Sequence, residues 1–120
     1  MVKQITIMGT VYEVILGADP AEDKALENLF GYCSSSDKKI VIVDLSKLPD
    51  WDDDSDTSKR RQTNETLRHE IIHAFLHESG LHSSSLHYSN GWATNEEMVD
   101  WFAIQYPKIK HIYKLLDCEE

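Results

Sequence analysis

The spacing of apolar residues changes from a two-residue period in the first third of the chain to a helical period later. Lys3 to Ile7 and Val11 to Leu16 alternate apolar and polar residues around a glycine-threonine break. This alternation predicts two short strands joined as a hairpin. Gly31 to Ser34 and Lys39 to Asp44 flank a polar turn, and the second run is rich in β-branched residues. We therefore expect a second hairpin.

Two connecting segments carry other local signals. Asp19 followed by Pro20 is typical of a helix start, and Gly31 keeps any helix in this segment short. Leu48 to Ser58 is predicted to be a loop. Its acidic run, Trp51 to Asp56, lacks the turn glycine and the distal glutamate of an EF-hand calcium loop. We expect that run to be solvated and to cap the following helix.

The longest predicted helix covers Thr57 to Ser79, which contains neither Gly nor Pro. Gly80 stands where a glycine often ends a helix, and His82 to Gly91 is predicted to be a polar loop. One face of the helix should be apolar and face the core. Its members are Leu67, Ile71, Ala74 and Phe75.

A second helix is predicted near the C-terminus. Thr94 and Glu97 have the spacing of a capping box, with the threonine at the N-cap. The helix should run to Tyr106 and stop, or begin a further turn, at Pro107. Ile109 to Leu116 is then expected to form a terminal helix.

Composition and charge narrow the class of protein. With 120 residues, 41% of them hydrophobic, we expect a single globular domain over residues 1–120. No apolar run is long enough to span a membrane and no signal peptide is recognisable, which favours a cytoplasmic protein. The net charge of −9 argues against direct nucleic-acid binding. Cys33 and Cys118 stand far apart and in no metal-ligand spacing.

The candidate chemistry lies in the long helix, which contains His69-Glu70-Ile71-Ile72-His73. Residues four apart share one helix face, so His69 and His73 can converge on one zinc ion. Glu70 projects beside them, where a carboxylate can act as a general base. Ile71 and Ile72 turn away and anchor the helix. The alternative is a histidine-rich helix without a metal, since His77 continues the four-residue spacing.

A catalytic zinc needs a third protein ligand. His77 would have to reach back past His73. His82 and His87 in the following loop stay open as candidates, but a carboxylate on the next helix is the better one. Glu96 and Glu97 are adjacent there.

Asn95 to Asp100 resembles the second motif of the gluzincins, the thermolysin-like clan of zinc peptidases, in which HExxH is followed by a helix that bears ExxxD. The resemblance implies that Glu96 is the third zinc ligand. It also implies that Asp100 hydrogen-bonds a zinc-binding histidine, His69. Glu97 would point about 100° away along the helix circumference.

The layout of the whole chain also resembles small gluzincins such as the ImmA/IrrE-type peptidases of phages and mobile elements. This likeness implies an α+β, minimal zincin-like fold, with a small antiparallel sheet packed on the HExxH helix and beside the Glu-bearing helix. One sheet edge, Ile40 to Asp44, would border the cleft and pair with an extended peptide. The implied activity is hydrolysis of a peptide bond in a protein substrate, with one Zn²⁺ per chain.

Two other functions stay open. The chain can be a zinc-binding but inactive gluzincin scaffold that binds a partner protein, or an interaction protein without a metal. No motif identifies the residue that would stabilise the oxyanion of a peptidase. The candidates are His87, Tyr88, Tyr106, His111 and Tyr113.

Overall fold

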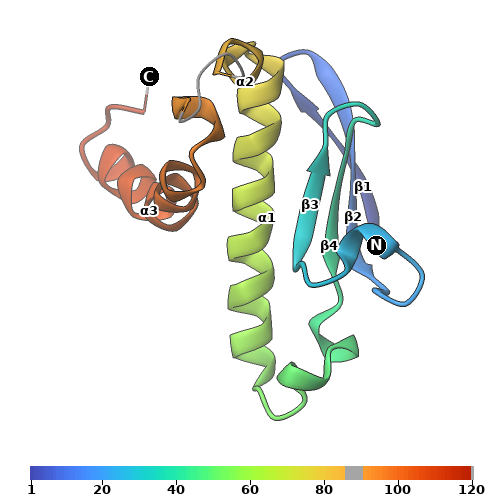
Figure 1. Ribbon diagram of the computed structural model, residues 1–120. Helices are drawn as coiled ribbons and strands as arrows, with labels where there is room; N and C mark the ends of the chain where they lie inside the picture. Colours follow the sequence, from blue (N-terminus) through green and yellow to red (C-terminus); the bar gives the residue numbers. More distant parts are fainter. Residues whose placement is uncertain (86–90, 120) are drawn as a thin grey trace.

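The computed structural model describes residues 1–85 and 91–119, and these form three layers (Figure 1). A four-stranded sheet is the first layer. Helix α1 (Asp56–Glu78) packs on one face of the sheet, and α3 (Glu96–Leu115) lies on the side of α1 away from the sheet. A short helix, α2 (Leu81–Ser85), follows α1. The α+β class expected from the sequence is confirmed.

The sheet has the order β1-β2-β4-β3, formed by Val2–Ile7, Thr10–Ala18, Lys39–Val43 and Gly31–Ser34 respectively. Both predicted hairpins are present, since β1 pairs with β2 and β3 with β4 in antiparallel register. The central pair is parallel, however, so the sheet is mixed and the expectation of an antiparallel sheet is wrong there. The second hairpin is placed with β4 inside and β3 outside. The expected free edge at Ile40 to Asp44 is therefore also wrong, because β3 forms that edge.

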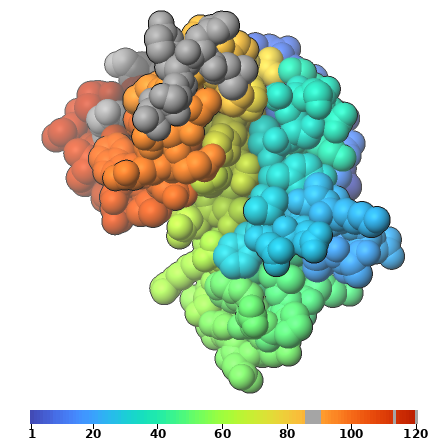
Figure 2. Space-filling view, viewed as in Figure 1, coloured from blue at the N-terminus to red at the C-terminus, as the bar shows by residue number. Residues whose placement is uncertain are grey.

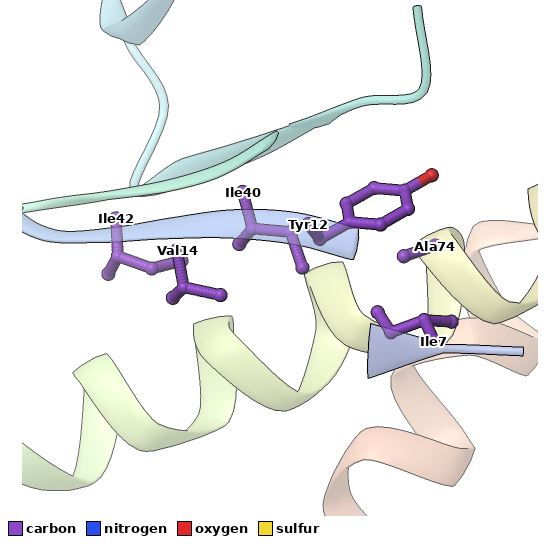
Figure 3. Packing of buried hydrophobic residues seen from close by; sticks show 6 residues of the cluster. All are labelled: Ile7, Tyr12, Val14, Ile40, Ile42 and Ala74. Carbon is purple, nitrogen blue, oxygen red and sulfur yellow. The ribbon is translucent and has the colours of Figure 1, made fainter. Parts of the chain in front are cut away.

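Alternation along the strands divides the apolar residues between the two faces of the sheet. Ile40 and Ile42 point toward α1 and are buried with four other residues of this core, Ile7, Tyr12, Val14 and Ala74 (Figure 3). Val41 and Val43 point to the opposite face, where they pack on Leu26 and Leu45. This burial of both faces fixes the register, because a shift by one residue would exchange them.

Short 3-10 helices cover that second face. They span Lys24–Leu26, Leu45–Lys47 and Pro49–Trp51. The helix start predicted at Asp19 is wrong: the Asp19 side chain accepts a hydrogen bond from the Ala21 amide at 2.9 Å and closes a turn instead. A local Asx turn satisfies the same donor that a helix cap would.

Helix α1 follows its prediction closely at both ends. Ser55, in the acidic loop, caps it by accepting a hydrogen bond from the Ser58 amide, and Gly80 follows the helix with φ +82°. Leu67 and Ile71 pack on the sheet core, but Phe75 is 46% exposed. Each step of four residues turns about 40° around a helix, which carries position 75 away from the sheet. The predicted apolar face is therefore wrong for Phe75.

Glu78 ties the C-terminal end of α1 to both hairpins. Its carboxylate accepts hydrogen bonds from Thr10 Oγ1 at 2.9 Å, from Tyr12 Oη at 2.8 Å and from Lys38 Nζ at 2.6 Å. These three contacts lower the pKa of Glu78 to about 2. The orientation of α1 across the sheet is thus held by hydrogen bonds as well as by apolar packing.

Helix α3 differs from its prediction at the start and in the middle. Its N-cap is Asn95, whose side chain accepts from the Met98 amide at 2.9 Å, so the capping box with Thr94 is wrong. The helix continues through Pro107 to Leu115 without a stop. A proline removes the hydrogen bond to the carbonyl four residues earlier, here that of Ala103. Arg68 of α1 supplies the missing donor: its Nε donates to that carbonyl oxygen at 2.6 Å.

This replacement predicts a coupled pair of mutations. Arg68→Met keeps most of the side-chain stem but leaves the Ala103 carbonyl without a donor, which should lower the free energy of unfolding by about 1–3 kcal/mol. In a Pro107→Ala background the alanine amide restores the helical hydrogen bond, and the same Arg68→Met change should cost less than about 0.5 kcal/mol. Urea unfolding of the four proteins in a chelator measures both costs. Equal costs in the two backgrounds would contradict this explanation of the uninterrupted helix.

Candidate metal centre

Helices α1 and α3 together place four of the predicted site residues in one cluster. His69 Nε2 lies 3.0 Å from His73 Nε2. The carboxylate of Glu96 lies against both rings, with one oxygen 3.1 Å from His69 Nε2 and the other 3.3 Å from His73 Nε2. On the far side of the His69 ring, Nδ1 lies 2.7 Å from Asp100 Oδ1. Residues of two helices, 31 positions apart at the widest, therefore meet.

Hydrogen-bond chemistry shows what this cluster lacks. A carboxylate only accepts, so the short contact to Asp100 assigns the proton of a neutral His69 ring to Nδ1. Its Nε2 then presents a lone pair toward Glu96 Oε2 at 3.1 Å, and two acceptor atoms at that distance need a proton or a cation between them. The donor set, two imidazole nitrogens and a carboxylate, is one that zinc accepts.

The distances match those expected around a zinc ion. Ligand atoms at about 2.0–2.1 Å from a tetrahedral zinc are separated by roughly 3.3 Å. The three separations among His69, His73 and Glu96 are 3.0, 3.1 and 3.3 Å. The His69 and His73 rings are mostly buried, with 19% and 17% of their side chains exposed, whereas Glu96 is exposed. The residues present therefore fit a metal ion approached from the solvent side.

Glu70 is the fifth acidic or basic residue at this cluster. Its carboxylate lies within 4.8 Å of the ligand nitrogens of His69 and His73, yet the side chain is buried. Burial raises the pKa of Glu70 to about 7, and the nearby charge of Glu96 adds to the rise while His69 opposes it. Burial also lowers the pKa of His73. A carboxyl group with a pKa near neutrality, beside two imidazoles, suits proton transfer.

The other candidates for ligands lie elsewhere. Glu97 is exposed and is not part of the cluster. His77 stacks on His82 of α2 with ring centroids 3.8 Å apart, so these two histidines contact each other. His87 and Tyr88 are outside the described residues. Of the candidates to stabilise an oxyanion, Tyr106 lines a cavity between α1 and α3, and His111 is exposed.

The free edge strand β3 borders the cluster on the sheet side. Gly31 lets β3 approach α1 closely, since a Cβ there would lie 2.9 Å from Thr66 Cγ2. Cys33 of β3 packs on the α1-facing core, and burial, with a contribution from the charge of Glu70, raises the pKa of its thiol to about 12. The thiol is thus held protonated and unreactive. Nothing in the sequence motifs pointed to Cys33 as a neighbour of Glu70.

No protein-family model, curated protein or solved structure matches the chain. No helix in the described ranges has the length and the apolar character needed to cross a membrane.

The raised pKa of Glu70 predicts how the stability of the metal-free protein depends on pH. Between pH 4.5 and pH 7 the folded state holds a proton on Glu70 that the unfolded state has lost. Stability contributed by this group therefore falls as pH rises through that window, by an amount on the order of 1–3 kcal/mol. Glu70→Gln should abolish this fall, so that the variant is more stable than the wild type at pH 8.

Urea unfolding in a chelator at pH 5 and pH 8 measures this difference. Glu65→Gln on the same helix is the control and should keep the wild-type dependence. The difference between the wild type and Glu70→Gln isolates Glu70 from His73, whose lowered pKa acts in the opposite direction. An identical pH dependence in the wild type and in Glu70→Gln would show that Glu70 is not protonated by its burial.

Proposed function

We propose that this protein is a zinc-dependent hydrolase of the gluzincin type that cleaves a peptide bond in a protein substrate. The observation that carries the proposal is the convergence of His69, His73 and Glu96 within 3.3 Å of one another, with buried Glu70 beside them. The contact between His69 and Asp100 adds support, because zinc-binding histidines usually donate their other N–H to such a partner.

In this proposal His69, His73 and Glu96 hold one zinc ion per chain. Bound there, zinc would supply Lewis acidity, making a water molecule more acidic and polarising a substrate carbonyl. Asp100 keeps the His69 ring oriented and its Nε2 free of a proton. Without Asp100, the ring could rotate or change tautomer, which is how loss of such partners weakens metal binding about 10–100-fold.

Glu70 moves the proton in the proposed reaction. Its carboxylate accepts a proton from the attacking water as the oxygen bonds to the carbonyl carbon. It then delivers that proton to the amide nitrogen as the C–N bond breaks, so that the products are a carboxylic acid and an amine. One carboxylate can perform both transfers, because it is a base before the attack and an acid after it.

The position of β3 supports a peptide as the substrate. Among the described residues, one edge of this strand pairs with no other strand, and the strand packs against α1 near Glu70. An extended peptide can add to such an edge by main-chain hydrogen bonds. The likeness to peptidases of phages and mobile elements leads us to propose an intracellular protein as the target.

The test combines metal content with cleavage. Protein purified without a metal-affinity tag should contain one zinc per chain, Glu96→Ala should lose most of it, and Glu97→Ala should keep it. Zinc-loaded wild type should cleave members of a fluorescence-quenched peptide library. Glu70→Gln, loaded equally with zinc, should be slower by about 10²–10⁴-fold.

Each other outcome has a distinct meaning. Zinc bound at full occupancy with no cleavage in the wild type would favour the alternative, a zinc-binding scaffold that recognises a partner. Equal zinc in Glu96→Ala would remove Glu96 from the ligand set. No zinc in the wild type, even after addition to folded protein, would contradict the metallopeptidase proposal.

A further inference from the structure

The outermost face of α3, which points away from α1, is unusually apolar. Val99 and Ala103 are buried on the opposite side. The outer face carries Trp101, Ile104, Ile112 and Leu115, which are 53%, 40%, 50% and 67% exposed. At 100° per residue these four positions fall within an arc of about 80°. We call them the outer stripe. In Figure 2, α3 is the orange to red part at the left of the molecule.

Two charged residues lie within the same arc as the outer stripe. Glu97 and Lys108 are eleven residues, about three helical turns, apart, so they project in nearly the same direction. Both are exposed, and neither forms an ion pair with another residue in the described ranges. In chain order, Glu97, Lys108 and the four residues of the outer stripe follow one another at steps of four, three, four, four and three residues. Spacing of this kind is that of a helix-helix seam.

The order of charges along α3 selects the partner and its direction. On this face the acidic residue, Glu97, lies in the first turn of α3, and the basic residue, Lys108, lies in its second half. A second α3 packed antiparallel on this face brings Glu97 of one helix beside Lys108 of the other. A parallel pair would place like charges together, which destabilises an interface.

We propose that the part of this face from Glu97 to Lys108, with Trp101 and Ile104 of the outer stripe between them, is the contact surface of a two-fold symmetric homodimer in which the α3 helices of two copies pack antiparallel. The two-fold axis passes between Phe102 and Ala103. Glu97 of each copy then faces Lys108 of the other, and Trp101 faces Ile104. In such an isologous arrangement the ion pair between Glu97 and Lys108 forms twice, once on each side of the two-fold axis.

The expected dimer is weak and depends on concentration. With the axis at this position the two copies overlap along residues 96–109, about 21 Å of helix, and a stripe about 10 Å wide along it covers roughly 200 Å² per copy. Stable interfaces bury about 800 Å² per partner. The strong negative charge of each chain also opposes association. The ion pairs across the seam therefore decide whether the dimer forms.

A charge exchange tests the proposal. Sedimentation velocity of the full chain over a range of concentrations should show reversible dimerisation of the wild type. Glu97→Lys alone and Lys108→Glu alone should each raise the dissociation constant at least about tenfold, because each places like charges opposite each other twice. The double variant restores opposite charges and should return to within about threefold of the wild type.

The controls make the same charge changes far from α3, on exposed positions of the first hairpin. Glu13→Lys and Lys3→Glu should leave the dissociation constant unchanged. Circular dichroism checks that every variant is folded. The proposal would be overturned if the wild type is monomeric at all concentrations, or if neither single change raises the dissociation constant. It would also be overturned if the double variant dissociates as readily as the single variants.

Discussion

The packing of α3 against α1 is the contact on which the metal cluster depends, since neither helix carries all of its members. His69 and His73 come from α1, whereas Glu96 and Asp100 come from α3. A small core of Leu76, Ala93 and Val99 holds the two helices together. The hydrogen bond from Arg68 to the Ala103 carbonyl adds a polar contact on the same interface. Glu96 and Asp100 precede this contact by one to two turns of α3.

The two partners of this interface are anchored unequally. Helix α1 is packed on the sheet and is tied to both hairpins through Glu78. Among the described residues, helix α3 packs mainly on α1 and on the short 3-10 helix Trp92–Thr94 that precedes it, and many of its apolar side chains are exposed. Because its ligands come from both helices, a bound metal ion would stabilise the packing of α3 on α1. The free energy of metal binding would then add to the free energy of folding.

The sequence predicted those features that follow from local periodicity. The two hairpins, the long helix and its glycine terminator follow from residues close together in the chain. The expectation that Glu96 and Asp100 lie beside His69 came from the resemblance to the gluzincin motifs, and the structure brings these residues together.

The errors arose where residues distant in sequence decide the outcome. Pro107 ends a helix unless another donor replaces its missing amide, and nothing local shows that Arg68 does so. The strand order, with β4 inside and parallel to β2, depends on how the second hairpin docks. The same holds for Cys33, which lies near enough to Glu70 to feel its charge because β3, at Gly31, packs closely on α1.

X-ray absorption spectroscopy at the zinc edge of the loaded protein tests the central claim most directly, because it reports which atoms surround the metal. We predict a first shell of two imidazole nitrogens and light oxygen ligands, with oxygen scattering reduced in Glu96→Ala if that variant is loaded with excess zinc. A sulfur atom in the shell, or a third imidazole, would place the metal on Cys33, Cys118 or another histidine and would contradict the cluster described here.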